Sequence, residues 1–112
     1  MPEISWEDFQ KVDVRVGRVV EAKPFPEARE PSIKLLLDFG PEVGQKRTSA
    51  QLTAHYDPEG LVGRQVVAVV NFPPKRIAGF KSEVLVLGVP DEVGEVVLLS
   101  PDRDVPLGGR MF

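Results

Sequence analysis

Apolar residues recur at every second position over much of the chain, which is the period of a β-strand with one buried face. The alternation is clear over residues 12–16, where valines alternate with polar residues, and over residues 33–39. After Gly17 it slips by one residue, which predicts a β-bulge at that glycine. The same period, interrupted by glycines and prolines, predicts further strands at about 45–49, 65–72, 83–89 and 95–100.

Two short segments lack this period and predict helices. Ser5 is a good N-cap for a short helix at about 5–10, and Trp6 and Phe9, three residues apart, would share the side that faces the body of the protein. Residues 50–58 allow one or two helical turns before the next glycines. We therefore expect one helix at the N-terminus and one between the third and fourth strands.

Five or six short strands with little helix indicate an all-β barrel or sandwich. A long first strand that bends at a bulge can serve both halves of a small barrel. Together with the helix expected between strands three and four, this favours a five-stranded OB-type barrel over an SH3-like one. The length of 112 residues suggests a single domain over 1–112, with terminal extensions beyond the barrel.

Two predicted strands are apolar on both faces. Val66–Val70 is uninterrupted and Val84–Val89 nearly so, whereas a strand of a lone small barrel should be polar on its outer side. The terminal segments, a second subunit, or both must cover these faces. We predict a two-fold symmetric homodimer, with four aromatic or sulfur-containing terminal residues as candidates for the interface: Trp6, Phe9, Met111 and Phe112.

Composition narrows the possible chemistry. The chain has no Cys and one His, which excludes disulfides, thiolate zinc sites, iron–sulfur clusters and a cysteine nucleophile. No apolar run approaches the roughly 20 residues of a membrane-spanning helix. We expect a soluble, cytoplasmic protein with no metal, no cofactor and no membrane insertion.

No pattern of catalytic residues stands out. The chain has neither a phosphate-binding P-loop nor the GxSxG elbow of a serine hydrolase. Ser49, His55 and Asp57 do not make a convincing triad, and His55 is better explained as a surface histidine. The sequence therefore predicts a binding protein and not an enzyme.

The charges are unevenly distributed. The net charge is −3, but residues 43–82 carry six basic side chains against two acidic ones. Within this region, residues 71–83 combine two phenylalanines with three cations in a loop between two strong strands. Such a loop suits RNA, where cations hold phosphates and rings stack on bases. It also suits an extended peptide in an apolar groove, and a plain proline-stiffened hairpin is a third interpretation.

Several separated motifs resemble the CsaA family. They are Lys11–Gly17 (KVDVRVG), Ser49–Gln51 (SAQ), Asn71–Pro74 (NFPP) and Gly79–Leu85 (GFKSEVL), and the similarity runs from about residue 8 to the end. This family lies within a wider group of tRNA-binding OB-fold domains, some attached to methionyl-tRNA synthetases. The resemblance implies a homodimer with chaperone-like, export-related activity on preproteins and a tRNA-binding surface.

The resemblance also places candidate residues. In the wider group, RNA contact is associated with a loop in which Asn71, Arg76 and Ser82 occupy matching positions, whereas Ala78 and Leu85 depart from the usual residues. From their charge and position we add six further RNA-binding candidates: Lys46, Arg47, Ser49, Gln51, Lys75 and Lys81. Phe72 and Phe80 are candidates for peptide binding. The leading prediction is a tRNA-binding protein with chaperone activity on unfolded or secretory precursors, and the alternative is a peptide-binding chaperone with no physiological RNA ligand.

Overall fold

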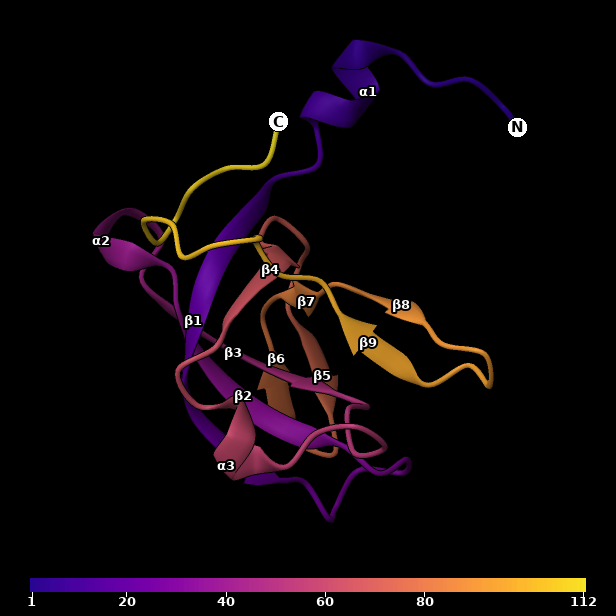
Figure 1. The fold of residues 1–112 in the computed structure, drawn as a ribbon, viewed down its shortest axis with the longest axis vertical. Coiled ribbons are helices and arrows are strands. Elements are labelled where there is room, and N and C mark those ends of the chain that lie inside the picture. Colours follow the sequence, from indigo (N-terminus) through magenta and orange to yellow (C-terminus); the bar gives the residue numbers. More distant parts are fainter.

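The computed structural model describes residues 1–112 and is organised around one long strand, β1 (Val14–Pro24). The first half of β1 pairs antiparallel with β4 (Gln65–Val69), and its second half pairs antiparallel with β2 (Ile33–Asp38). β3 (Gln45–Ala50) and β7 (Leu85–Val86) complete a five-stranded sheet in the order β3-β2-β1-β4-β7. Because β1 serves both halves, the sheet curls on itself into the all-β, five-stranded OB barrel predicted from the sequence (Figure 1).

The bulge that bends β1 lies at Val20 and not at Gly17. The register with β2 shifts between Val19 and Glu21, whereas Gly17 pairs regularly with Val66 of β4. The predicted position was therefore wrong. Gly17 is required by packing, because a side chain there would collide with the buried ring of Phe39. A glycine needed for a close approach looks the same in a sequence as one needed for a bulge.

The barrel closes between β3 and β7 through a seam of individual hydrogen bonds. The buried hydroxyl of Thr48 donates to the carbonyl oxygen of Val84 at 2.6 Å. Beside it, the backbone N–H of Glu83 donates to the carbonyl oxygen of Arg47 at 2.8 Å. These bonds replace a continuous ladder, so the barrel is nearly closed.

The barrel interior is filled by alternate residues of the strands. Along β2, Ile33, Leu35 and Leu37 are buried and the intervening residues are partly exposed, as the strand period predicts. Phe39 continues this inward row, and the same cluster takes in residues from the other strands and from both sides of the β3–β4 connection: Val19, Leu52, Leu61, Val66, Ala68 and Val84.

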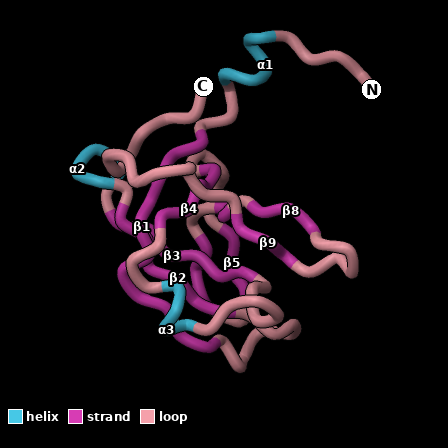
Figure 2. The backbone as a smooth tube through the Cα atoms, viewed as in Figure 1, coloured by secondary structure: helices cyan, strands magenta, loops and turns pink.

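Three short helices lie outside the barrel (Figure 2). α1 (Trp6–Gln10) begins with the predicted Ser5 cap. α3 (Pro58–Leu61) lies between β3 and β4 as expected, but it begins only at Pro58, where the predicted segment of 50–58 ends. α2 (Gly40–Val43), between β2 and β3, was not predicted. None of the three is long and apolar enough to cross a membrane.

The expectation that α1 packs onto the body of the protein was wrong. No residue of α1 is buried, and Figure 1 shows the helix standing off one end of the barrel. Trp6 and Phe9 do share one side of the helix, with ring centroids 5.4 Å apart. Trp6 remains 63% exposed, so the apolar side of the helix is not covered by the rest of the chain.

Two hairpins follow β4. One lies in the loop for which a hairpin was one interpretation, and the other pairs the end of the strand predicted at 83–89 with the strand predicted at 95–100. β4 ends at Val69, and the following loop forms a hairpin from β5 (Lys75–Ile77) and β6 (Phe80–Ser82). The strand predicted at 83–89 divides into β7, which pairs with β4, and β8 (Gly88–Pro90), which pairs with β9 (Val96–Leu98). In Figure 1 the β8–β9 hairpin projects from the side of the barrel.

The C-terminal segment lies along β1. Val16 exchanges backbone hydrogen bonds with Gly108 and Gly109, at 2.8 and 3.0 Å. The guanidinium of Arg15 reinforces this contact by donating to Asp13 at 2.6 Å and to the carbonyl oxygen of Gly108 at 3.0 Å. The hydrogen bond to Asp13 raises the pKa of Arg15 above its ordinary value. The C-terminal extension is thus part of the fold, because it connects the end of the chain to the start of β1.

Candidate nucleic-acid interface

The β5–β6 hairpin turns through two residues with left-handed backbone. Ala78 and Gly79 have φ angles of 47° and 80°, the combination of a two-residue turn that suits the twist of paired strands. The pairs Lys75–Ser82 and Arg76–Lys81 face each other across the hairpin. The segment is therefore a hairpin, as one of the three interpretations of the sequence had it, and it holds three cations in fixed register.

A groove of about 560 Å³ runs beside this hairpin. Ser49 and Gln51 line it from the end of β3, and Lys75 and Arg76 line it from β5. Its apolar wall includes Ile77, Leu85, Val86 and Val96. Cations and hydrogen-bonding groups thus face an apolar wall within one open groove.

A second hollow, of about 410 Å³, continues the first. The two share Ser49, Lys75, Ile77 and Leu85, and the second adds Phe72, which is 54% exposed. We call the joined hollows the hairpin groove. Six of the residues predicted to bind RNA or peptide meet there: Ser49, Gln51, Phe72, Lys75, Arg76 and Ser82.

Other predicted residues lie outside the hairpin groove. Lys46 lies 3.8 Å from Glu83 and forms an ion pair with it. Lys81 is exposed beside Arg76 but does not line either hollow. Arg47 and Phe80 line a separate hollow.

Asn71 is occupied within the fold. Its Oδ1 accepts from the backbone N–H of Asp13 at 3.0 Å, and its Nδ2 donates to the carbonyl oxygen of Lys11 at 2.7 Å. Both ends of the amide therefore tie the end of β4 to the start of β1. This position holds the N-terminal segment in place, and one acceptor site of Oδ1 and one N–H of Nδ2 remain open on this exposed side chain.

Ser82 is also partly engaged. Its hydroxyl lies 2.9 Å from the hydroxyl of Thr48, whose own hydrogen is directed to Val84. Ser82 must therefore be the donor in this pair, which leaves its oxygen free only as an acceptor.

Ion pairing divides the cations into two groups. Six cations have a carboxylate oxygen within 4.0 Å: Lys11, Arg15, Arg18, Lys46, Arg103 and Arg110. The others have no such partner, and all but Arg64 lie in or next to the hairpin groove and the neighbouring hollow: Lys23, Arg29, Lys34, Arg47, Lys75, Arg76 and Lys81. The free positive charge is concentrated on one side of an acidic protein, which favours an anionic ligand there.

Sequence reasoning missed Arg29, Lys23 and Lys34. Arg29 lines the hairpin groove from the irregular loop after β1, where neighbouring glutamates hide its significance in the sequence. Lys23 and Lys34 occur singly within predicted strands. Only the pairing of the strands brings them together.

His55 has a structural partner. It donates from Nε2 to the Asp91 carboxylate at 2.7 Å and so links the β3–β4 connection to the β8–β9 turn. This bond, with those from the backbone N–H groups of Glu95 and Val93, lowers the pKa of Asp91 below its ordinary value. No three His, Cys, Asp or Glu side chains come close enough together to hold a metal ion.

The terminal residues predicted at a dimer interface gather at one place. Trp6, Phe9, Met111 and Phe112 line a common hollow of about 330 Å³ between α1 and the C-terminus. Met111 is 45% exposed and Phe112 fully exposed. They form an apolar surface without a partner in the isolated chain.

Comparison with known proteins places this geometry in a family. Residues 14–110 match the model of a family described as "Putative tRNA binding domain". The methionine–tRNA ligase of Methanococcus aeolicus is 37% identical over 96% of the chain, which spans 15% of that ligase. The activity of the ligase as a whole is therefore not carried over by this match.

Two crystal structures resemble the chain over nearly their whole length. The chaperone CsaA from Bacillus anthracis is 55% identical with a TM-score of 0.93, covering 99% of this chain and 100% of that one. The CsaA chaperone protein from Picrophilus torridus is 46% identical with a TM-score of 0.91, covering 98% and 100%. With the match over residues 14–110, these identities show that the chain belongs to the tRNA-binding domain family, in its CsaA branch.

Proposed function

We propose that this protein binds tRNA or a similarly structured RNA in the cytoplasm through the hairpin groove, and that it acts by binding and not by catalysis. The observation that carries this proposal is the pair of cations without a carboxylate partner, Lys75 and Arg76, that line the groove beside its apolar wall. Lys81 is exposed next to Arg76 across the hairpin. Its membership of the tRNA-binding domain family supports the same ligand.

The chemistry of the groove suits a folded nucleic acid. Lys75 and Arg76 would hold phosphates. The Ser49 hydroxyl and the Gln51 amide would form hydrogen bonds with sugars and base edges. Phe72 offers an exposed ring for a base that leaves its stack. Most of the affinity would come from phosphate contacts and would fall steeply with salt.

The test is a fluorescence titration of tRNA at several salt concentrations. Changing Lys75 and Arg76, the two groove cations, to Ala should weaken binding and lower the log–log salt slope by about 1.4–1.8, at about 0.7–0.9 per lost phosphate contact. The matched control changes Lys11 and Arg103 to Ala, two exposed cations at distant ion pairs. An unchanged slope for the hairpin variant would remove the groove as the RNA site.

A second function, holding unfolded or secretory precursor chains, is favoured by the apolar part of the groove. Phe72 and Leu85 are each at least half exposed and line the same hollow. The chaperones CsaA are close structural relatives. An unfolded apolar peptide should bind with little salt dependence and should lose affinity when Phe72 is changed to Ala. Peptide binding without any tRNA binding would favour the chaperone as the sole function.

We also propose that two copies form a homodimer through the terminal apolar surface of Trp6, Phe9, Met111 and Phe112. These side chains come together in one hollow and remain exposed in the isolated chain. A two-fold contact would place the same surface on both copies and cover it. It would also bring two hairpin grooves onto one particle, which suits a large folded ligand.

A further inference from the structure

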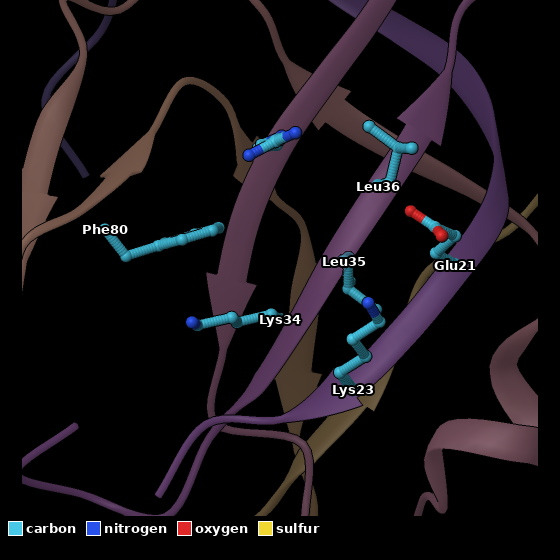
Figure 3. Close-up of a pocket in the computed structure, with 7 residues that line it drawn as sticks. Glu21, Lys23, Lys34, Leu35, Leu36 and Phe80 are labelled. Carbon is cyan, nitrogen blue, oxygen red and sulfur yellow. The ribbon is translucent and has the colours of Figure 1, made fainter. Parts of the chain in front are cut away.

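A separate hollow lies on the outer face of β1, β2 and β3. It has a volume of about 230 Å³, and three basic side chains line it: Lys23, Lys34 and Arg47. Glu21 is the one carboxylate in the lining, and Phe80 of the β5–β6 hairpin closes one side. Figure 3 shows Phe80 and Lys34 on one side of this hollow and Glu21 and Lys23 on the other. The hollow is thus open, basic and bounded by a ring.

Strand register creates this arrangement. Lys23 of β1 lies directly opposite Lys34 of β2, and Lys34 lies directly opposite Ser49 of β3. The three residues form a row across the outer face, in which the Cβ atoms of neighbours are about 5 Å apart. Ser49 lines the hairpin groove and the two lysines line the hollow, so the two ends of the row lie at the two cavities.

The lysine pair is unfavourable without a ligand. Like charges directly opposite each other on neighbouring strands destabilise a sheet. Neither lysine has a carboxylate within 4.0 Å, Glu21 included, and the same holds for Arg47. A bound anion would relieve the repulsion that the fold otherwise tolerates.

Lys34 is held in position by aromatic rings. Its Nζ lies 4.5 Å from the centroid of the Phe25 ring and 5.0 Å from that of Phe80. The two rings pack edge to face, with centroids 5.4 Å apart. Cation–π contacts of this kind orient an ammonium group while leaving its charge unneutralised. The positive charge at the centre of the row is therefore fixed in place.

We propose that this outer face is a second phosphate-binding site for the RNA, and that the phosphodiester backbone continues from the hairpin groove past Ser49 onto Lys34 and Lys23. Arg47 borders the same path from the next row of the sheet. The inference rests on the proposed RNA-binding function and extends the contact from the hairpin groove to the separate hollow on the outer face of the sheet. It predicts that Lys23 and Lys34 contact the ligand. The residues of the hairpin groove by themselves do not imply such a contact.

The test changes both lysines to Met, which keeps most of each aliphatic stem and removes the charge. For tRNA, the log–log salt slope should fall by about 1.4–1.8 relative to the unchanged protein. The matching double change to Arg keeps the charge and should keep the slope. The control with Lys11 and Arg103 changed to Ala should also bind as the unchanged protein does.

A folding measurement separates a ligand-binding role from a structural one. Since Lys23 faces a like charge, Lys23→Ala alone should leave the melting temperature unchanged or raise it. A clear fall in melting temperature, or equal loss of the slope in the Met and Arg variants, would overturn the proposal.

The outcomes also distinguish the two proposals. If the hairpin variant lowers the salt slope and the Lys23/Lys34 variant does not, the RNA function stands and the second site is wrong. If the unchanged protein shows no salt-dependent binding of tRNA, both are wrong.

Discussion

Gly17 and Phe39 touch so closely that no side chain fits between them. A Cβ atom built on Gly17 would lie 2.8 Å from Cε1 of the Phe39 ring, and that ring is 0% exposed. The backbone of β1 thus forms part of the wall of the core. The contact joins the first half of β1 to the residue that follows β2.

Changing Gly17 to Ala should therefore destabilise the protein by about 1–3 kcal/mol, as overpacking of a core does. Urea unfolding measures the change. Gly60→Ala is the matched control, because nothing lies within 4 Å of its added Cβ, and it should be neutral or slightly stabilising. Adding Phe39→Leu to Gly17→Ala should recover part of the loss, and no recovery would contradict the steric explanation.

Asn71 should contribute to stability and not to phosphate binding. Replacing it with Ala removes two hydrogen bonds that connect the end of β4 to Lys11 and Asp13, and should cost about 1–3 kcal/mol. The salt slope for tRNA should stay unchanged, since no cation is lost. Urea unfolding and the tRNA titration check the two parts. A lower slope with unchanged stability would place Asn71 at the ligand instead.

Thr48 should control the closure of the barrel. Thr48→Val keeps the shape but leaves the buried carbonyl oxygen of Val84 without its donor, at a cost of about 1–3 kcal/mol. Thr48→Ser keeps the hydroxyl and should lose less. Hydrogen exchange at the N–H of Glu83, which bonds across the same seam, should accelerate in the Val variant only. Equal effects of both variants would show that the methyl group matters more than the hydroxyl.

Acid should remove a stabilising contribution of Asp91. Its pKa is lowered in the folded protein, so the unfolded chain takes up this proton at a higher pH than the folded chain does. The contribution is complete above the ordinary carboxyl pKa of about 3.9 and is lost as pH falls below it. We expect the difference in urea midpoint between the unchanged protein and Asp91→Asn to be constant above about pH 5 and to shrink below about pH 4. Parallel curves down to pH 3 would rule out this role.

The terminal apolar surface should control association. Light scattering at micromolar concentration should give about twice the chain mass of 12.4 kDa. Trp6→Ala combined with Phe112→Ala should shift the mass towards one chain, because these exposed side chains line the proposed interface. Val62→Ala, at an exposed position beside α3, should change nothing. A monomer mass for the unchanged protein would exclude the dimer.

Local patterns in the sequence were enough to predict most of the strands. The alternation of β2 from Ile33 to Leu37 survives in its burial, and the Ser5 cap begins α1 as expected. Both signals depend on residues only a few positions apart, and the geometry of a strand or helix fixes how such residues lie relative to one another. The motifs at Lys11–Gly17 and Asn71–Pro74 were likewise enough to indicate the family, which the match over residues 14–110 confirms.

Partners across strands were decided only by the tertiary structure. Lys46 looked like a free cation but pairs with Glu83, and Asn71, predicted as a ligand group, also bonds to residues about 60 positions away. Conversely, Lys23 and Lys34 gain significance only because the register of β1 and β2 sets them side by side. Sequence determines which residues alternate along each strand, whereas the lateral neighbours depend on pairing, bulges and turns between distant segments. The charge that remains free for a ligand is therefore a property of the folded barrel.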